Sequence, residues 1–372
     1  MKLIFQILLL VNVVIASSCK AQNDQSISLN IGDPAPPMRV SAWLKGEPIQ
    51  YFKKGRVYVV EFWATWCVPC KAAMPHLSTL AREYKDKVAI IGVDVMEKKN
   101  TNFEKVSAFV DSMALQMDYY VAVQDSNFME TDWLAASGEQ SIPKTFVING
   151  EGKLAWIGHP SKLDQILPKI LNSDWDIEEV LTKRNSDRYL RELEDSLNYE
   201  LMKYKEDRLK PGDLGKPELA LLEIKEILRE EPRLEYSPLI AMHTFNNLLK
   251  TEPHKAYEYG KVAIVTSTYQ QPPYDFIIGS INWYSDKLNL PAEIYLLGAE
   301  AYQEQIEGIV YPELVKLSKS YTKMAEWYWR ANEKAKAIEA QQKAIEALKS
   351  EKDSTKEKLA TLEFRLEEYK KR

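Results

Sequence analysis

One short stretch constrains the fold more than any other: E-F-W-A-T-W-C-V-P-C-K, residues 61–71. The run that leads into it, from Arg56 to Trp63, is rich in β-branched and aromatic residues, which is typical of a buried strand. Cys67 and Cys70 follow at once, three positions apart, and apolar residues at helical spacing come after them. A strand, a tight turn and a helix that begins at the cysteines are therefore predicted, which indicates an α/β unit.

This placement gives the two cysteines different chemistry. Unpaired N–H groups and the helix dipole at a helix N-terminus favour a thiolate, so Cys67 is predicted to be the nucleophile. Cys70 lies three positions on, on the same face of the first turn, and is predicted to be the resolving thiol. Pro69 fits the first helical turn, where its missing N–H costs little, and the pair Val68-Pro69 helps to set the redox potential.

Two other meanings of a C-x-x-C pair were weighed. A structural zinc site needs four ligands, but the chain has a single further cysteine, Cys19, and four scattered histidines. We therefore expect no metal and no cofactor. Two inert core cysteines would not be expected at the end of a strand, so the redox interpretation is favoured.

The first half of the chain alternates strand-like and helix-like segments. Strands are expected at 56–63, 88–94, 119–123, 144–148 and 154–157, and helices after Cys70, around 103–113 and at 163–171. N-G-E-G at 149–152 is a tight-turn signal between the last two strands. This alternation, ending in a hairpin, predicts an α/β domain with a mixed sheet flanked by helices, over residues 22–172.

The second half of the chain has a different pattern of predicted secondary structure. After Asn172 the strand signals stop, and charged helices with leucine-spaced apolar residues are expected over 173–372. The segment from Met324 to Leu348 resembles a tetratricopeptide repeat, with Asn332 near the position where glycine is usual. The sequence thus predicts an all-α, repeat-like domain, and an irregular helical bundle is the alternative.

The N-terminus has the proportions of an export signal. Thirteen mostly apolar residues follow Met1-Lys2, too few to span a membrane. Residues 1–21 are therefore interpreted as a signal peptide or lipoprotein signal. In the second case Cys19 would be lipidated and would anchor the protein to a membrane, whereas cleavage after Ala21 would release a soluble protein. Both alternatives place the mature chain outside the cytoplasm, most simply in the periplasm.

Three motifs in order carry a family resemblance: G-D-P-A-P (32–36), F-W-A-T-W-C-V-P-C-K (62–71) and S-I-P-K-T-F-V-I-N (141–149). Together they resemble the thioredoxin family, and in particular its extracytoplasmic TlpA/ResA-type thiol-disulfide oxidoreductases, over residues 27–171. The resemblance implies a thioredoxin-like α/β domain and disulfide exchange by the cysteine pair.

The resemblance also implies roles for individual residues. Pro143 would be a cis-proline that faces the cysteine pair, and Ile142 would offer backbone groups to the bound substrate. Pro75 matches the proline that kinks the first helix of the family. Lys144 departs from the family pattern, in which threonine is frequent at that position.

Glu61 is the one acid in the strand before the cysteines. It shares parity with Trp63 and should be buried or half-buried, and a buried carboxylate normally has a reason or a partner. In thioredoxins an acid at the matching position lies beneath the resolving cysteine, so Glu61 is interpreted as the general base for Cys70, with a pKa raised by burial. The alternative is that Glu61 points outward or pairs with a lysine. Trp63 and Trp66 are expected to pack around the turn, and Trp66 either shields Cys67 and contacts substrate or belongs to the core.

The expected function is reduction of protein disulfides in the bacterial cell envelope. The partners would be disulfide-containing envelope proteins and a thiol protein that reduces the enzyme again, with the helical domain recruiting partners. A net charge of -5 gives no reason to expect nucleic acid. A scaffold protein is one alternative, and a thiol peroxidase is another. The peroxidase is disfavoured because Ala64 stands where those enzymes carry threonine.

Overall fold

The computed structural model describes residues 28–207, 210, 212–266, 274–308, 316–351 and 354–371. The predicted signal segment and Cys19 lie outside these residues. The chain divides into two compact units, 1–183 and 184–372. The first unit extends beyond residue 172, where we placed the end of the redox domain, because Ile177, Val180 and Leu181 at the start of the next helix pack against its core.

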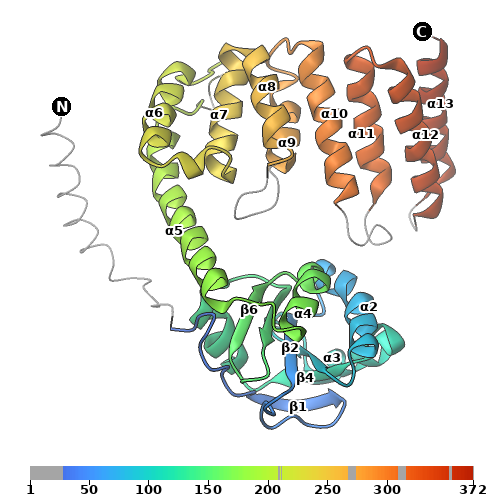
Figure 1. Ribbon diagram of the computed structural model, residues 1–372. Helices are drawn as coiled ribbons and strands as arrows, with labels where there is room; N and C mark the ends of the chain where they lie inside the picture. Colours follow the sequence, from blue (N-terminus) through green and yellow to red (C-terminus); the bar gives the residue numbers. More distant parts are fainter. Residues whose placement is uncertain are drawn as a thin grey trace, which may run out of the picture. The chain divides into compact units, whose positions relative to one another are not determined.

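The first unit is built on one mixed sheet (Figure 1). Its strands lie in the order β1-β4-β3-β2-β5-β6. Strands β2, β3 and β4 pair in parallel, while β1, β5 and β6 join in antiparallel fashion. The bounds are β1 (Val40–Lys45), β2 (Val57–Trp63), β3 (Val88–Asp94), β4 (Tyr120–Gln124), β5 (Lys144–Ile148) and β6 (Leu154–Gly158). The predicted thioredoxin-like α/β fold with a mixed sheet is confirmed.

The helices of this unit connect and cover the strands. They are α2 (Val68–Glu83), α3 (Phe103–Met113), η1 (Ala114–Met117), η2 (Glu130–Leu134), η3 (Ala135–Ser137), η4 (Pro160–Lys162) and α4 (Leu163–Leu171). The two central strands β2 and β3 are buried along their whole length, as expected for parallel strands covered on both faces. The edge strand β1 was not predicted, because V-S-A-W-L-K is half-exposed and has no clear alternation.

The two faces of the sheet have different contents. Tyr58, Val60 and Phe62 of β2 belong to an apolar cluster on one face. Alternation along the strand places Glu61 and Trp63 on the other face, where the Trp63 ring lies 5.5 Å from the ring of Phe109 on α3. Trp63 is the last residue of β2, so the turn that carries the cysteines starts directly beyond it.

The second unit is helical throughout its described part, as predicted. After α5 (Ile177–Met202), which spans the division between the units, come α6 (Pro217–Glu230), η5 (Pro232–Leu234), α7 (Pro238–Thr251), α8 (Pro253–Ala263), α9 (Tyr274–Tyr284), α10 (Ala292–Glu307), α11 (Leu317–Arg330), α12 (Lys334–Ser350) and α13 (Lys356–Lys371). Consecutive helices pack side by side from α6 to α8 and from α9 to α13, and α10 also packs on α8 (Figure 1).

The predicted helix pair near the C-terminus is present as α11 and α12. Asn332, in the turn between them, has a φ of 63°, the left-handed conformation in which asparagine substitutes for glycine. Ala337, Ala340 and Ala344 are buried along α12, and such small side chains let the two helices approach closely. The assignment of this unit to the tetratricopeptide type stays a prediction.

Candidate active site

The two cysteines lie where β2 gives way to α2. Cys67 is the N-cap residue of α2, and its Sγ accepts a hydrogen bond from the Cys70 N–H at 3.2 Å. The two sulfur atoms form a disulfide, with the Cα atoms 5.3 Å apart. Cys67 is 2% exposed and Cys70 is 0% exposed. The predicted position of Cys67 at a helix N-terminus is confirmed, and it is the cysteine of the pair that retains access to solvent.

The turn before Cys67 is held by the loop that follows β3. Thr65 donates its backbone N–H to Glu97 Oε1 at 2.5 Å and its hydroxyl to Glu97 Oε2 at 2.9 Å. The indole N–H of Trp66 donates to the Met96 carbonyl at 2.8 Å. On the other side, Lys71 Nζ on α2 donates to the Thr65 carbonyl at 3.0 Å. Sequence reasoning missed Glu97 and Met96, because their roles depend on the ends of β2 and β3 meeting in the sheet. It also missed Lys71, whose bond to Thr65 spans six positions across the cysteine turn.

Two apolar side chains stand at the surface of this turn. Trp66 is 42% exposed and Val68 is 58% exposed, whereas Trp63 is fully buried. Trp66 therefore does not belong to the core, and its position beside Cys67 suits contact with a substrate. Pro69 lies in the first turn of α2, as predicted.

Glu61 is completely buried, and both of its carboxyl oxygens are without a hydrogen-bond partner in the described part of the chain. It pairs in register with Gly92 on β3 and with Thr145 on β5. Burial raises the pKa of Glu61 from 4.5 to about 8. The prediction that Glu61 is buried is confirmed, and the alternatives of an outward side chain or a lysine partner are wrong. At neutral pH this carboxyl group is protonated.

The segment before β5 forms the neighbouring wall. The Ile142–Pro143 peptide bond is cis, as the family resemblance implies, with Ile142 half-buried and Pro143 buried. Lys144 pairs in register with Phe62 on β2, which puts Pro143 beside the end of β2 where the cysteine turn begins. Lys144 Nζ forms an ion pair with Glu139 at 2.6 Å. This lysine, which departs from the family pattern, is thus engaged in an ion pair close to the cis-proline.

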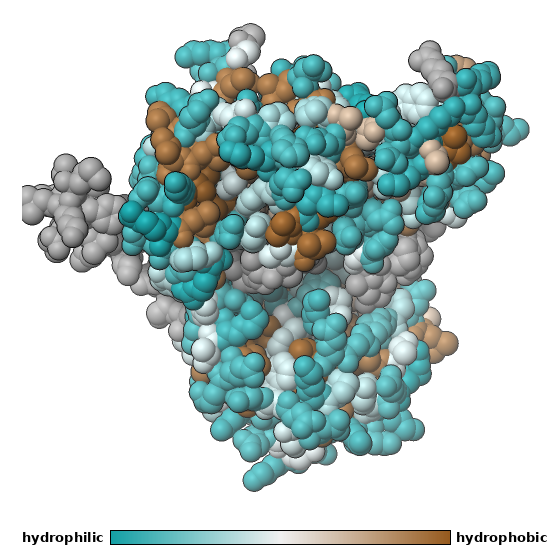
Figure 2. Space-filling model, turned by 45° about the horizontal axis from the view of Figure 1, so that its top comes forward, coloured by the Kyte–Doolittle hydropathy of each residue, from teal (hydrophilic) through white to brown (hydrophobic). Residues whose placement is uncertain are grey.

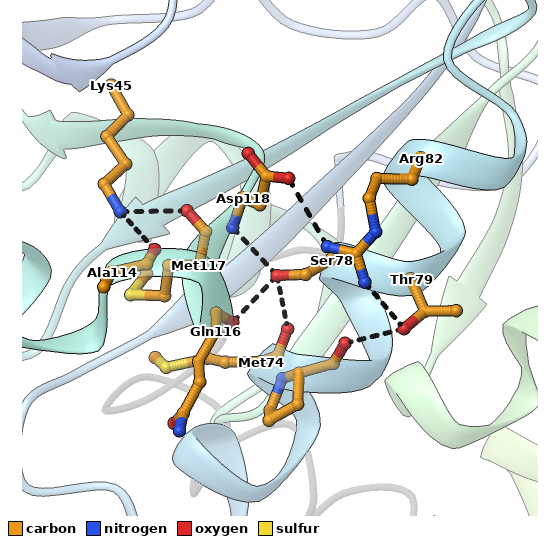
Figure 3. A network of polar contacts seen from close by, with 10 residues as sticks. Lys45, Met74, Ser78, Thr79, Arg82, Ala114, Gln116, Met117 and Asp118 are labelled. Carbon is orange, nitrogen blue, oxygen red and sulfur yellow. Dashed lines mark hydrogen bonds and ion pairs between the residues drawn. The ribbon is translucent and has the colours of Figure 1, made fainter.

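The helix that carries the cysteines is fastened along its length (Figure 3). Pro75 lies inside α2, as predicted. One turn on, the buried Ser78 hydroxyl lies 3.0 Å from the Met74 carbonyl and 2.8 Å from the Gln116 carbonyl, and it accepts the Asp118 N–H at 2.8 Å. Because Gln116 belongs to η1, these bonds tie α2 to the segment that leads into β4.

Lys45 fastens the same segment from the edge strand. Its Nζ donates to the carbonyls of Ala114 and Met117, at 2.8 Å and 3.1 Å (Figure 3). A rigid platform of this kind keeps catalytic side chains in place.

Among the described residues, no group of three or more His, Cys, Asp or Glu side chains is placed to hold a metal ion. In the same part of the chain, no helix is both long enough and apolar enough to cross a membrane.

Comparison with known proteins identifies relatives of the first unit. The family model named Thioredoxin matches residues 49–113. The chain is 35% identical over 152 residues to the protein FixW of Rhizobium leguminosarum, an alignment that covers 40% of this chain and 69% of FixW. It is 31% identical over 130 residues to the thiol-disulfide oxidoreductase ResA of Halalkalibacterium halodurans, covering 34% of this chain and 68% of ResA. The thiol:disulfide interchange protein HelX of Rhodobacter capsulatus is 30% identical over 119 residues, covering 32% of this chain and 61% of HelX.

Proposed function

Because this chain belongs to the thioredoxin-like thiol-disulfide oxidoreductases of the ResA type, we propose that it reduces disulfide bonds of other proteins through Cys67 and Cys70. The observation that carries this proposal is the Cys67–Cys70 disulfide at the N-terminus of α2. The strand that leads into it, β2, carries the buried carboxyl group of Glu61, whose pKa is raised to about 8.

The proposed reaction has two exchange steps. In the reduced enzyme, the Cys67 thiolate attacks one sulfur of the substrate disulfide, which gives a mixed disulfide and releases the other substrate sulfur as a thiolate that takes up a proton. Cys70 then loses its proton to Glu61 and attacks Cys67 Sγ. The substrate leaves as a dithiol and the enzyme is left as the disulfide. A thiol protein returns two electrons and two protons to the enzyme.

Glu61 must be ionised to accept that proton, and its raised pKa has a consequence for this step. With a pKa of about 8, a small fraction of Glu61 is ionised at pH 7, and that ionised form is a much stronger base than an exposed glutamate. The same group can return the proton when the enzyme is reduced again. Glu61 thus acts as a proton carrier for Cys70 in both directions.

The reaction itself is tested by reduction of a protein disulfide such as that of insulin, with dithiothreitol as the electron source. Full-length protein should accelerate the reduction, and Cys67→Ser should abolish the acceleration. Cys70→Ser should also stop turnover, because the mixed disulfide on Cys67 cannot be resolved. Equal rates with and without the wild-type protein would contradict the proposal.

The cellular place of the reaction is proposed from the N-terminal sequence. An apolar run followed by Cys19 supports export to the bacterial envelope, with Cys19 lipidated or the signal cleaved after Ala21. Growth with radioactive palmitate distinguishes these two outcomes. A lipoprotein should carry label that Cys19→Ala removes, whereas a cleaved soluble protein should carry none in either form.

The helical unit is proposed to recruit the partners. Its described helices leave large apolar side chains at the surface, and hydrophobic patches are visible among hydrophilic residues on this unit (Figure 2). Exposed aliphatic and phenylalanine side chains of this unit include Leu219, Leu222, Val262, Val265 and Phe364. Exposed apolar surface of this kind marks protein interaction sites. A chain shortened after Lys183 should keep its activity on a small disulfide and lose efficiency toward a physiological partner. Equal efficiency of both chains toward that partner would contradict the recruiting role.

A further inference from the structure

A second carboxyl group is buried below the redox turn. Asp94 is the last residue of β3 and is 3% exposed. It pairs in register with Trp63 on β2, on the side away from the apolar cluster, and with Val123 on β4. Glu61 and Asp94 therefore lie on the same face of the sheet, with Trp63 beside both of them.

Asp94 is connected to the turn before Cys67 through Glu97. The pKa of Asp94 is raised by burial first, and then by the charge of Glu97 and a hydrogen bond with the Glu97 carboxyl group. Asp94 Oδ1 is itself buried without a hydrogen-bond partner in the described part of the chain. Two carboxyl groups can form a hydrogen bond only when one of them carries a proton. Both Glu97 oxygens accept hydrogen bonds from Thr65, and Asp94 is the more deeply buried acid of the pair, so the proton belongs to Asp94.

The charged groups around Asp94 favour the same assignment. Glu130 on η2 adds negative charge, and it accepts the Met96 N–H at 2.9 Å and a bond from the Gln124 amide. Burial first, then the charge of Glu97 and its hydrogen bond, and then the charge of Glu130, raise the pKa of Asp94 to about 8. The nearby cations act on the turn itself: Lys71 of α2 donates to the Thr65 carbonyl, and Lys98 lies over the Trp66 ring.

We propose that Asp94 is a positioning residue of the redox site, whose carboxylic acid proton bonds Glu97 and so holds the Glu97 carboxylate against Thr65, two residues before Cys67. The inference rests on the proposed function and adds a pH-sensitive element to it. With Asp94 neutral, the links from Asp94 to Glu97, Thr65 and Cys67 are complete. Ionisation of Asp94 removes the donor and places a second negative charge next to Glu97, which loosens the turn and disfavours the Cys67 thiolate.

Two substitutions separate the role of the Asp94 proton from the role of the side chain's shape. Asp94→Asn keeps the size of the side chain and supplies an amide N–H donor at every pH. Asp94→Leu keeps a similar size and supplies no donor. Asp118→Asn is the matched control, because Asp118 is an acid of the same unit whose carboxylate faces Arg82 at the surface.

The measurement is the rate at which the reduced full-length protein reacts with 2,2′-dithiodipyridine between pH 6 and pH 9.5. The reaction rate of each variant is divided by that of the wild type at the same pH, so that the titration of Cys67 itself largely cancels from the ratio. The Asp94→Asn ratio should be near one at pH 6 and rise to about threefold at pH 9.5, the size expected for one hydrogen bond. The Asp94→Leu ratio should be about one third at pH 6 and approach one at pH 9.5. The Asp118→Asn ratio should stay flat.

Each outcome decides the inference. A flat Asp94→Asn ratio in a reactive protein overturns the role of Asp94 and leaves the proposed function standing. A wild type that does not react at any pH overturns both. If Asp94→Leu fails to fold, as shown by the loss of its near-ultraviolet circular dichroism, the Asp94→Asn ratio alone gives the answer.

Discussion

Glu61 on β2 lies directly opposite Thr145 on β5, and the carboxyl oxygens of the first and the hydroxyl of the second are buried without a hydrogen-bond partner in the described residues. Directly opposed residues of an antiparallel pair share one face of the sheet. An unpartnered buried carboxyl group is far less costly when neutral than when charged. The structure therefore keeps one proton on the sheet face from which the cysteine turn begins.

Replacing Glu61 should affect one of the two exchange steps. Glu61→Gln removes the proton acceptor for Cys70 and keeps the shape of the side chain. Resolution of the mixed disulfide at pH 7 should slow by a factor of about 100, the lower end for a general base, while attack by Cys67 changes less than about twofold. Rapid-mixing kinetics with a fluorescent disulfide peptide separates the steps. Glu61 has no role as a base if the resolution rate of Glu61→Gln equals that of the wild type.

Glu61 should also make stability depend on pH. Its pKa is about 8 in the folded protein and near 4.5 when exposed, so between these values the unfolded chain binds fewer protons than the folded one. The free energy of unfolding should thus fall as pH rises from 5 to 8, with a contribution of up to about 1.4 kcal/mol per pH unit. Urea denaturation of wild type and Glu61→Gln at several pH values measures this contribution to the free energy of unfolding. Parallel pH profiles for the two proteins would contradict the raised pKa.

Gly92 should tolerate no side chain. A Cβ at this position would lie 2.9 Å from Cε2 of Tyr119 and 3.2 Å from Nε1 of Trp63. Gly92→Ala should therefore lower the free energy of unfolding by about 1–3 kcal/mol through overpacking. Gly279→Ala on α9 is the control, since nothing lies within 4 Å of a Cβ there, and it should be neutral or stabilising. Equal stability of the two variants would show that the sheet face yields to the added methyl group.

Replacing Ser78 should lower the stability of the protein more than its disulfide-reducing activity. Ser78→Ala leaves the Asp118 N–H and the Gln116 carbonyl without their buried partner, at a cost of about 1–3 kcal/mol in the free energy of unfolding. Ser112→Ala provides the comparison, because that hydroxyl is exposed and bonds only within α3. Thermal unfolding of both variants, with insulin reduction at 25 °C, checks the prediction. A Ser78→Ala protein as stable as Ser112→Ala would exclude the anchoring role.

The sequence was most informative where chemistry depends on local spacing. Cys67 at a helix start, the burial of Glu61 and the hairpin after Ile148 all follow from alternation, helical spacing or turn residues within a few positions. The bond that the Thr65 N–H donates to Glu97 joins residues 32 positions apart, and it exists only because β2 and β3 pair in register. No local sequence pattern predicts such a contact.

The same limit applies to the boundary between the two units. The helix α5 reads as one continuous amphipathic segment, yet Ile177 and Leu181 pack on the core of the first unit and Leu190 and Leu201 on that of the second. Periodicity identifies an apolar stripe and does not say which core covers each part of it.

The most direct test of the account is to trap the first covalent intermediate. Fully reduced Cys70→Ala protein is mixed with a peptide that contains one disulfide, the products are digested without reductant, and the cross-linked fragments are identified by mass spectrometry. The account predicts a mixed disulfide between the peptide and Cys67. The absence of any adduct, or an adduct formed as readily by Cys67→Ala through Cys70, would contradict it.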